Sequence, residues 1–388
     1  MENKRESNIE LLRIVSMLLI VAYHCRLSIG FSANNEITTI ILFTIGIWGI
    51  LGVDCFFIIS FNFLYKSQFK TKKFLYLIKE ILFYTIPLII ISTIYNYYKT
   101  GNNVLEIIKN MFIIGINQPF WRDVYWFATI YLLMYLSFPI LNKILKNFNE
   151  KDLKKIVIIL TGIILLYQMR ETVIEDYFFA IYIYITFFYI KSYKEDWLKR
   201  NCVACFWICT FFIIFFKIIS ECNNNSIFMI NLIAGKFGRH SILFFANSIF
   251  MFYIFKNIKL KNSKFINIIA STTFGIYLFH ENQIFSIRNY IYNWTQKNIF
   301  KQISIANSNY LLIFYVVEIL CIFGIGIIID LIRQFIFKRL DNKKTNTKID
   351  MYYKKIDNKM NEIYEKTEND CVIDKYIKNY EGIKETNY

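Results

Sequence analysis

Long apolar stretches separated by short polar clusters run through most of the chain. Many of them approach the roughly 17–25 residues that an α-helix needs to cross a bilayer. The pattern predicts an all-α, polytopic integral membrane protein with about ten transmembrane helices. The expected spans are residues 9–25, 38–65, 74–98, 124–142, 156–169, 177–190, 202–220, 240–255, 265–287 and 310–337.

The composition agrees with a membrane protein. The 388 residues are 56% hydrophobic and only 19% charged, whereas a soluble domain of this size carries more charge. The apolar parts of residues 103–123 and 227–234 are too short to span, so we expect these segments to lie at the membrane interface or to re-enter the membrane.

Basic residues in the connecting segments predict the orientation. With a cytoplasmic N-terminus, the inner loops hold 17 Lys and Arg in 40 positions and the outer loops 11 in 89. This positive-inside bias places both termini in the cytoplasm. It also explains the net charge of +16, so nucleic acid is not an expected partner. Residues 1–337 form the predicted membrane domain, and residues 338–388 form a charged cytoplasmic tail.

The first span carries two ionisable side chains, Arg13 and His24. Their spacing of eleven residues corresponds to roughly 1100°, about three turns plus 20°, so both lie on one helix face about 16 Å apart. Two ionisable residues on one face of a membrane helix favour a functional role. The alternative for Arg13 is a side chain that reaches the lipid headgroups on the inner side. The alternative for His24 is a histidine that only packs between helices.

Other ionisable residues fall inside predicted spans. His280 lies as far along the ninth span as His24 lies along the first, so the two imidazoles should sit at similar depth. Asp54, in the second span, is expected to pair with a cation or to orient a histidine, with a structural ion pair as the alternative. His240 is expected at the interface.

Four motifs in register resemble the acyltransferase-3 family of polytopic bacterial O-acyltransferases. Arg13 and His24 fit the family's arginine, ten residues, histidine pattern. The other three are Gly52-Val53-Asp54-Cys55-Phe56-Phe57-Ile58-Ile59-Ser60, then Trp126-Phe127 with Tyr131, Tyr135 and Pro139, and finally Gly275-Ile276-Tyr277-Leu278-Phe279-His280. Ser60-Phe61-Asn62 lacks the glycine that usually follows in the second motif.

The resemblance implies a cytosolic acyl-CoA donor, most often acetyl-CoA, and a hydroxyl of a surface or exported polysaccharide, or of a lipid-linked glycan, as acceptor. It places the enzyme in the inner or plasma membrane, with polysaccharide-assembly proteins as expected partners and no metal.

The resemblance also implies roles for individual residues. His24 would be the general base or a transient acyl carrier, assisted by Arg13, Asp54 and His280. The expected substrate-binding residues are Glu10, Tyr23, Trp126, Tyr131, Tyr277, Glu281 and Asn282. Lys70, Lys72, Lys73 and Lys79 stand where many members carry an arginine cluster, and they are the expected donor-binding residues.

Two other functions remain open at this point. A transporter or flippase of a lipid-linked glycan would also place ionisable groups between ten helices, although inverted repeats and helices broken by Gly or Pro are not evident. A glycan polymerase would favour a large outer loop, and none here exceeds about 25 residues.

Overall fold

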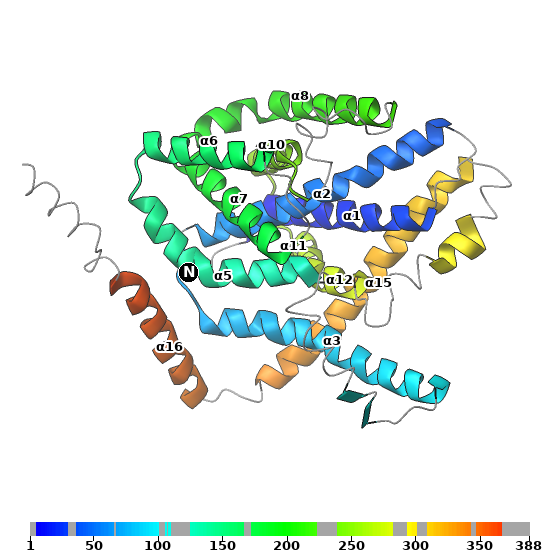
Figure 1. Ribbon diagram of the computed structural model, residues 1–388. Helices are drawn as coiled ribbons and strands as arrows, with labels where there is room; N and C mark the ends of the chain where they lie inside the picture. The colour runs from blue at the N-terminus through cyan, green and yellow to red at the C-terminus, as the bar shows by residue number, and fades with distance from the viewer. Residues whose placement is uncertain are drawn as a thin grey trace, which may run out of the picture.

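A computed structural model describes most of the chain, and all of the regular secondary structure in the described part is helical, without a strand (Figure 1). The described residues are 5–29, 36–65, 67–100, 105–106, 108–109, 125–166, 172–222, 239–281, 293–300, 309–342 and 347–366. The predictions for Asn282, for residues 227–234 and for most of 103–123 lie outside these ranges.

Helices coincide with all ten predicted spans. Their bounds are α1 (Ser7–Ile29), α2 (Glu36–Leu64), α3 (Thr71–Thr100), α5 (Trp126–Lys146), α6 (Glu150–Leu166), α7 (Val173–Tyr193), α8 (Glu195–Cys222), α10 (Ile242–Asn257), α11 (Lys264–Ser271), α12 (Thr273–His280), η3 (Gln296–Phe300), α15 (Asn309–Asn342) and α16 (Thr347–Lys366). Within the described residues, five helices are long and apolar enough to cross a membrane. The full set of ten crossings and the cytoplasmic termini remain predictions.

Helix α1 is central to the bundle, where it contacts α2, α10, α11, α12 and α15 (Figure 1). Its closest partner is α2. A Cβ atom added at Gly49 would overlap the side chain of Tyr23, and one added at Gly52 would meet the Ser16 carbonyl oxygen at 2.5 Å. The two glycines therefore allow the close approach of the helices, as small residues do at membrane helix interfaces.

We expect Gly49→Ala to destabilise the protein by about 1–3 kcal/mol, because overpacking at a helix interface forces the backbones apart. The matched control is Gly162→Ala in α6, where nothing lies within 4 Å of the added Cβ. That change should be neutral or slightly stabilising, since alanine favours a helix over glycine. Thermal unfolding in detergent measures both. Equal midpoints for the two variants would show that the α1–α2 contact does not depend on Gly49.

Two short helices, α11 and α12, cover the described part of the ninth predicted span. Helices α11 and α12 are separated at Thr272. The hydroxyls of Ser271, Thr272 and Thr273 each donate to the carbonyl three residues earlier, at 2.7, 2.7 and 2.8 Å. Such back-bonding competes with the helix ladder and bends helices. Gln334 of α15 donates to the Ser271 carbonyl and so compensates the break.

A buried ionic network connects α15 to α3. Arg333 is 2% exposed and donates to both carboxylate oxygens of Asp330, at 2.7 and 3.1 Å. Its Nη2 atom also lies 2.9 Å from Glu80 Oε1, and the Tyr84 hydroxyl donates to Asp330 at 2.7 Å. Gly275 of α12 leaves room for the Asp330 carboxylate. Pairing of this kind is what charged groups inside a bilayer require.

Part of the predicted tail, α16, lies across the start of α3. The Asp357 carboxylate accepts from the Thr71 backbone N–H at 2.7 Å and from the Thr71 hydroxyl at 2.5 Å. It thus occupies the positive end of the α3 dipole, where an anion is favoured. Asp350 of α16 pairs with Lys72 at 3.5 Å.

Candidate active site

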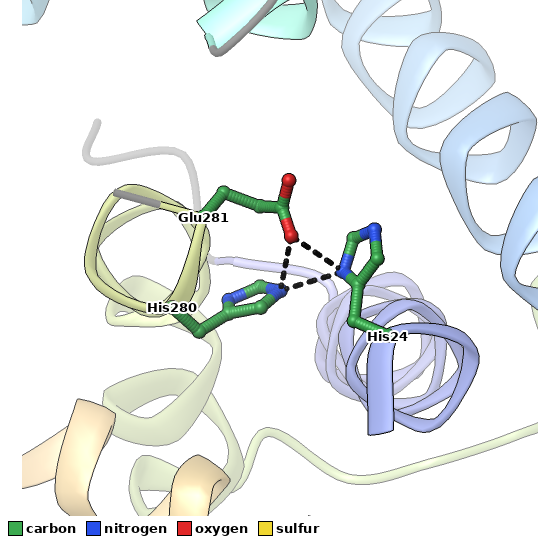
Figure 2. Close-up of side chains that lie close together, drawn as sticks. All are labelled: His24, His280 and Glu281. Carbon is green, nitrogen blue, oxygen red and sulfur yellow. Dashed lines mark hydrogen bonds and ion pairs between the residues drawn. The ribbon is translucent and has the colours of Figure 1, made fainter. Parts of the chain in front are cut away.

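Two histidines and one carboxylate meet between α1 and α12 (Figure 2). His24 is near the end of α1, His280 is the last residue of α12, and Glu281 is the C-cap residue of α12. His24 Nδ1 lies 3.1 Å from His280 Nε2 and 2.9 Å from Glu281 Oε1. The prediction that the two imidazoles lie at similar depth is confirmed by this contact.

The second nitrogen of His280 determines the hydrogen-bonding direction. His280 Nδ1 lies 2.7 Å from the Ile276 carbonyl oxygen, which can only accept, so Nδ1 carries the proton. In a neutral His280 the lone pair is then on Nε2, which accepts from His24 Nδ1–H. It follows that the Nε2 atom of His24 carries the lone pair, and Figure 2 shows this atom pointing away from His280 and Glu281.

His24 is the most exposed of the three side chains in this site. The side chains of His280 and Glu281 are 1% and 6% exposed, whereas that of His24 is 13% exposed. The carboxylate 2.9 Å from His24 can stabilise an imidazolium formed when His24 accepts a proton. A carboxylate and a histidine that together orient a base are the elements of acid–base catalysis.

Among the described residues no ion pair or histidine contact of Asp54 is found, so its role stays a prediction. Asp54 is 1% exposed, and its Oδ2 atom has no hydrogen-bond partner there. Gly52 faces α1, and a residue two positions further along is rotated by about 200°. Asp54 is therefore directed away from α1, and Glu281 supplies the carboxylate at His24.

A second cluster forms where α5, α7 and the start of α10 meet. Asp176, whose side chain is 1% exposed, lies 3.2 Å from Arg239 and 2.8 Å from His240 Nε2. The Arg239 guanidinium is 4.3 Å from the ring centroid of Trp126. One face of Trp126 is thus covered by Arg239, which limits how a sugar ring could stack there. Sequence reasoning missed Asp176 and Arg239, although an acid and a base near the ends of two spans are a recognisable signal.

Tyr23 and Tyr277 lie beside the histidines. The ring centroid of Tyr23 is 5.3 Å from that of His24, and the ring centroid of Tyr277 is 6.4 Å from that of His280. Each of the two predicted substrate-binding tyrosines therefore lies beside one of the two histidines.

Arg13 belongs to a separate group. It pairs with Glu10 at 3.0 Å, so Glu10 serves as its partner, and Arg13 also lies near Tyr131 and Lys73. Burial lowers the pKa of Lys73, and the positive charges of Arg13 and Lys70 lower it further. Excess positive charge therefore gathers at the cytoplasmic end predicted for α1 and α3.

The other two predicted donor-binding lysines are paired with acidic residues. Lys72 contacts Asp350, and Lys79 lies 3.0 Å from Asp341. These exposed pairs contribute little to stability, so an anionic ligand can compete with them. Arg13, Lys70 and Lys73 therefore lie close together. Lys72 and Lys79 lie apart from them, next to acidic residues of the predicted tail.

The side chains of His24, His280 and Glu281 could also hold a metal ion. The ligand atoms of His24, His280 and Glu281 lie within 4.8 Å of one another, and His280 donates its other ring nitrogen to a carbonyl, as metal-bound histidines do. That no metal is bound remains a prediction.

The contact of His24, His280 and Glu281 lies in a bundle of long apolar helices, five of which, among the described residues, could cross a membrane. The chain belongs to the acyltransferase-3 family: the acyltransferase domain of that family matches residues 6–330. Membership implies membrane acyltransferase activity. No curated protein and no solved structure matches the chain.

Proposed function

We propose that this protein transfers an acyl group, most simply acetyl, from cytosolic acyl-CoA to a hydroxyl of a cell-surface or exported polysaccharide. It would do so in the bacterial inner or plasma membrane, next to polysaccharide-assembly proteins. The contact of His24 with both His280 and Glu281 carries the proposal, because it leaves one ring nitrogen available as a base.

The chemistry follows from the assigned protons. His24 Nε2 accepts the proton of the acceptor hydroxyl as its oxygen attacks the thioester carbonyl carbon. Glu281 compensates the positive charge on His24, and His280 holds the ring in place. When the C–S bond breaks, His24 returns the proton to the CoA thiolate. A covalent acyl-histidine is the alternative route.

The donor would approach from the cytoplasmic end of α1. Arg13, Lys70 and Lys73 gather there, and cations attract the phosphates of CoA. The Asp357 carboxylate at the α3 N-terminus occupies a position that also suits a phosphate.

Lys73→Glu should therefore raise the KM for acyl-CoA about tenfold and leave kcat nearly unchanged, because a charge contact of about 1.4 kcal/mol is lost from binding. Lys154→Glu in α6 is the control, since Lys154 is exposed on another helix. Steady-state kinetics with varied acetyl-CoA measure both. Equal KM values in the two variants would place the donor elsewhere.

A transporter or flippase of a lipid-linked glycan is the second candidate. The interruption between α11 and α12 favours it, because transporters bind substrates at broken helices. The NMR spectrum of the surface polysaccharide from a deletion strain separates the two functions. Loss of ester acetyl signals with unchanged chain length supports transfer, whereas loss of the whole glycan supports export.

A further inference from the structure

The N-terminus of α5 is buried next to the candidate active site. Phe127 and Ala128, in its first turn, are 8% and 0% exposed. The side chain of the N-cap residue, Tyr125, makes no capping hydrogen bond and instead donates to the Leu278 carbonyl of α12 at 2.7 Å. The first N–H groups of a helix have no partner within the helix, so this end of α5 presents donors toward α12.

Tyr277 of α12 packs against this end of α5. It is 5% exposed, and its ring centroid lies 5.9 Å from that of Tyr125 and 5.7 Å from that of Phe127. In the described part of the chain the Tyr277 hydroxyl makes no hydrogen bond of good geometry. An unsatisfied polar group is costly inside a membrane protein, so its retention calls for a ligand.

The location identifies the chemistry of that ligand. Tyr277 lies one turn before His280, with ring centroids 6.4 Å apart. The charges of Glu281 and Arg239 both act on its hydroxyl, and Glu281 has the stronger effect. Glu281 is also 2.9 Å from His24, so it pairs with the imidazolium once His24 has taken a proton. The hydroxyl donor and the positive end of the α5 dipole then favour an anion. Acyl transfer creates one such anion beside the base, the oxygen of the tetrahedral intermediate.

We propose that the Tyr277 hydroxyl and the N-terminal N–H groups of α5 form the oxyanion hole of the acyl transfer. This inference rests on the proposed function. As the acceptor oxygen bonds to the thioester carbon, the C=O π electrons move to the carbonyl oxygen, and Tyr277 donates a hydrogen bond to it. The C=O bond re-forms when the C–S bond breaks, and CoA leaves with the proton held by His24. Tyr277 is thus a catalytic residue.

The test is Tyr277→Phe in purified protein reconstituted in lipid nanodiscs, with acetyl-CoA as donor and base-de-esterified surface polysaccharide as acceptor. We expect kcat to fall 10²–10³-fold, the usual cost of one oxyanion donor, while the KM for acetyl-CoA stays unchanged. Phenylalanine keeps the ring and removes a hydroxyl that lacks a good hydrogen bond, so thermal stability should be retained.

The control is Tyr253→Phe. The Tyr253 hydroxyl is also buried and without a hydrogen-bond partner among the described residues, but it lies near Glu195 and Tyr65, away from the histidines. Its loss should leave kcat unchanged. An unchanged kcat in Tyr277→Phe would overturn the inference, and so would a raised KM with unchanged kcat, which would mean ground-state binding of an acidic substrate group.

His24→Ala in the same assay distinguishes a failure of the oxyanion hole from a failure of the proposed acyl transfer. If His24→Ala loses activity while Tyr277→Phe keeps its kcat, the oxyanion hole is wrong and the proposed function stands. If wild-type protein forms no ester, the proposed function itself fails.

Discussion

Replacing His24 with alanine should reduce acyl transfer by 10²–10⁴-fold, the usual contribution of a general base. The methyl group of alanine cannot accept the hydroxyl proton, and Glu281 then has no imidazolium to stabilise. O-acyl content of the surface polysaccharide, measured by NMR at equal membrane abundance, shows the effect in cells.

Cys25→Ala provides a matched control for His24→Ala. Cys25 is the next residue on α1 and is fully buried, so the change truncates a neighbouring side chain without touching the candidate base. It should retain O-acylation. Normal O-acyl content in His24→Ala would show that this histidine is only a packing residue.

Arg333→Met should destabilise the fold by about 3–5 kcal/mol, the typical cost of removing one partner from a buried ion pair. The change leaves the carboxylates of Asp330 and Glu80 buried without their shared cation. Thermal unfolding of detergent-purified protein, together with the monodisperse fraction in size-exclusion chromatography, measures the loss.

Arg339→Met is the control for Arg333→Met. It lies on the same helix but is exposed, with its guanidinium over the Phe335 ring at 4.3 Å, so its loss should cost less than about 1 kcal/mol. If both variants unfolded at the same temperature, the network between α3 and α15 would not be a main stabilising feature.

Long apolar stretches were enough to locate the helices, because a bilayer requires such stretches and allows few alternatives. Counting residues from the predicted membrane surface also placed His24 and His280 at one depth. Both results depend only on how far a residue lies along its own helix, and this distance can be counted from the sequence.

Contacts between helices were harder to predict, because they depend on helix rotation. Asp54 fits the family pattern, yet Glu281 contacts His24. The partners Glu80, Asp330 and Arg333 all lie inside predicted spans, and the cost of buried charge should have identified them. The break at Thr272 also had a local signal, the run Ser271-Thr272-Thr273.

The central claim is that the site of His24, His280 and Glu281 moves an acyl group from CoA to a sugar hydroxyl. The most direct measurement is the ratio of ester formed to CoA thiol released by reconstituted wild-type protein, with acetyl-CoA and de-esterified surface polysaccharide. We expect one ester for each thiol released, and both products reduced by 10²–10⁴-fold with His24→Ala. Thiol release without ester, or ester formation by His24→Ala at the wild-type rate, would contradict it.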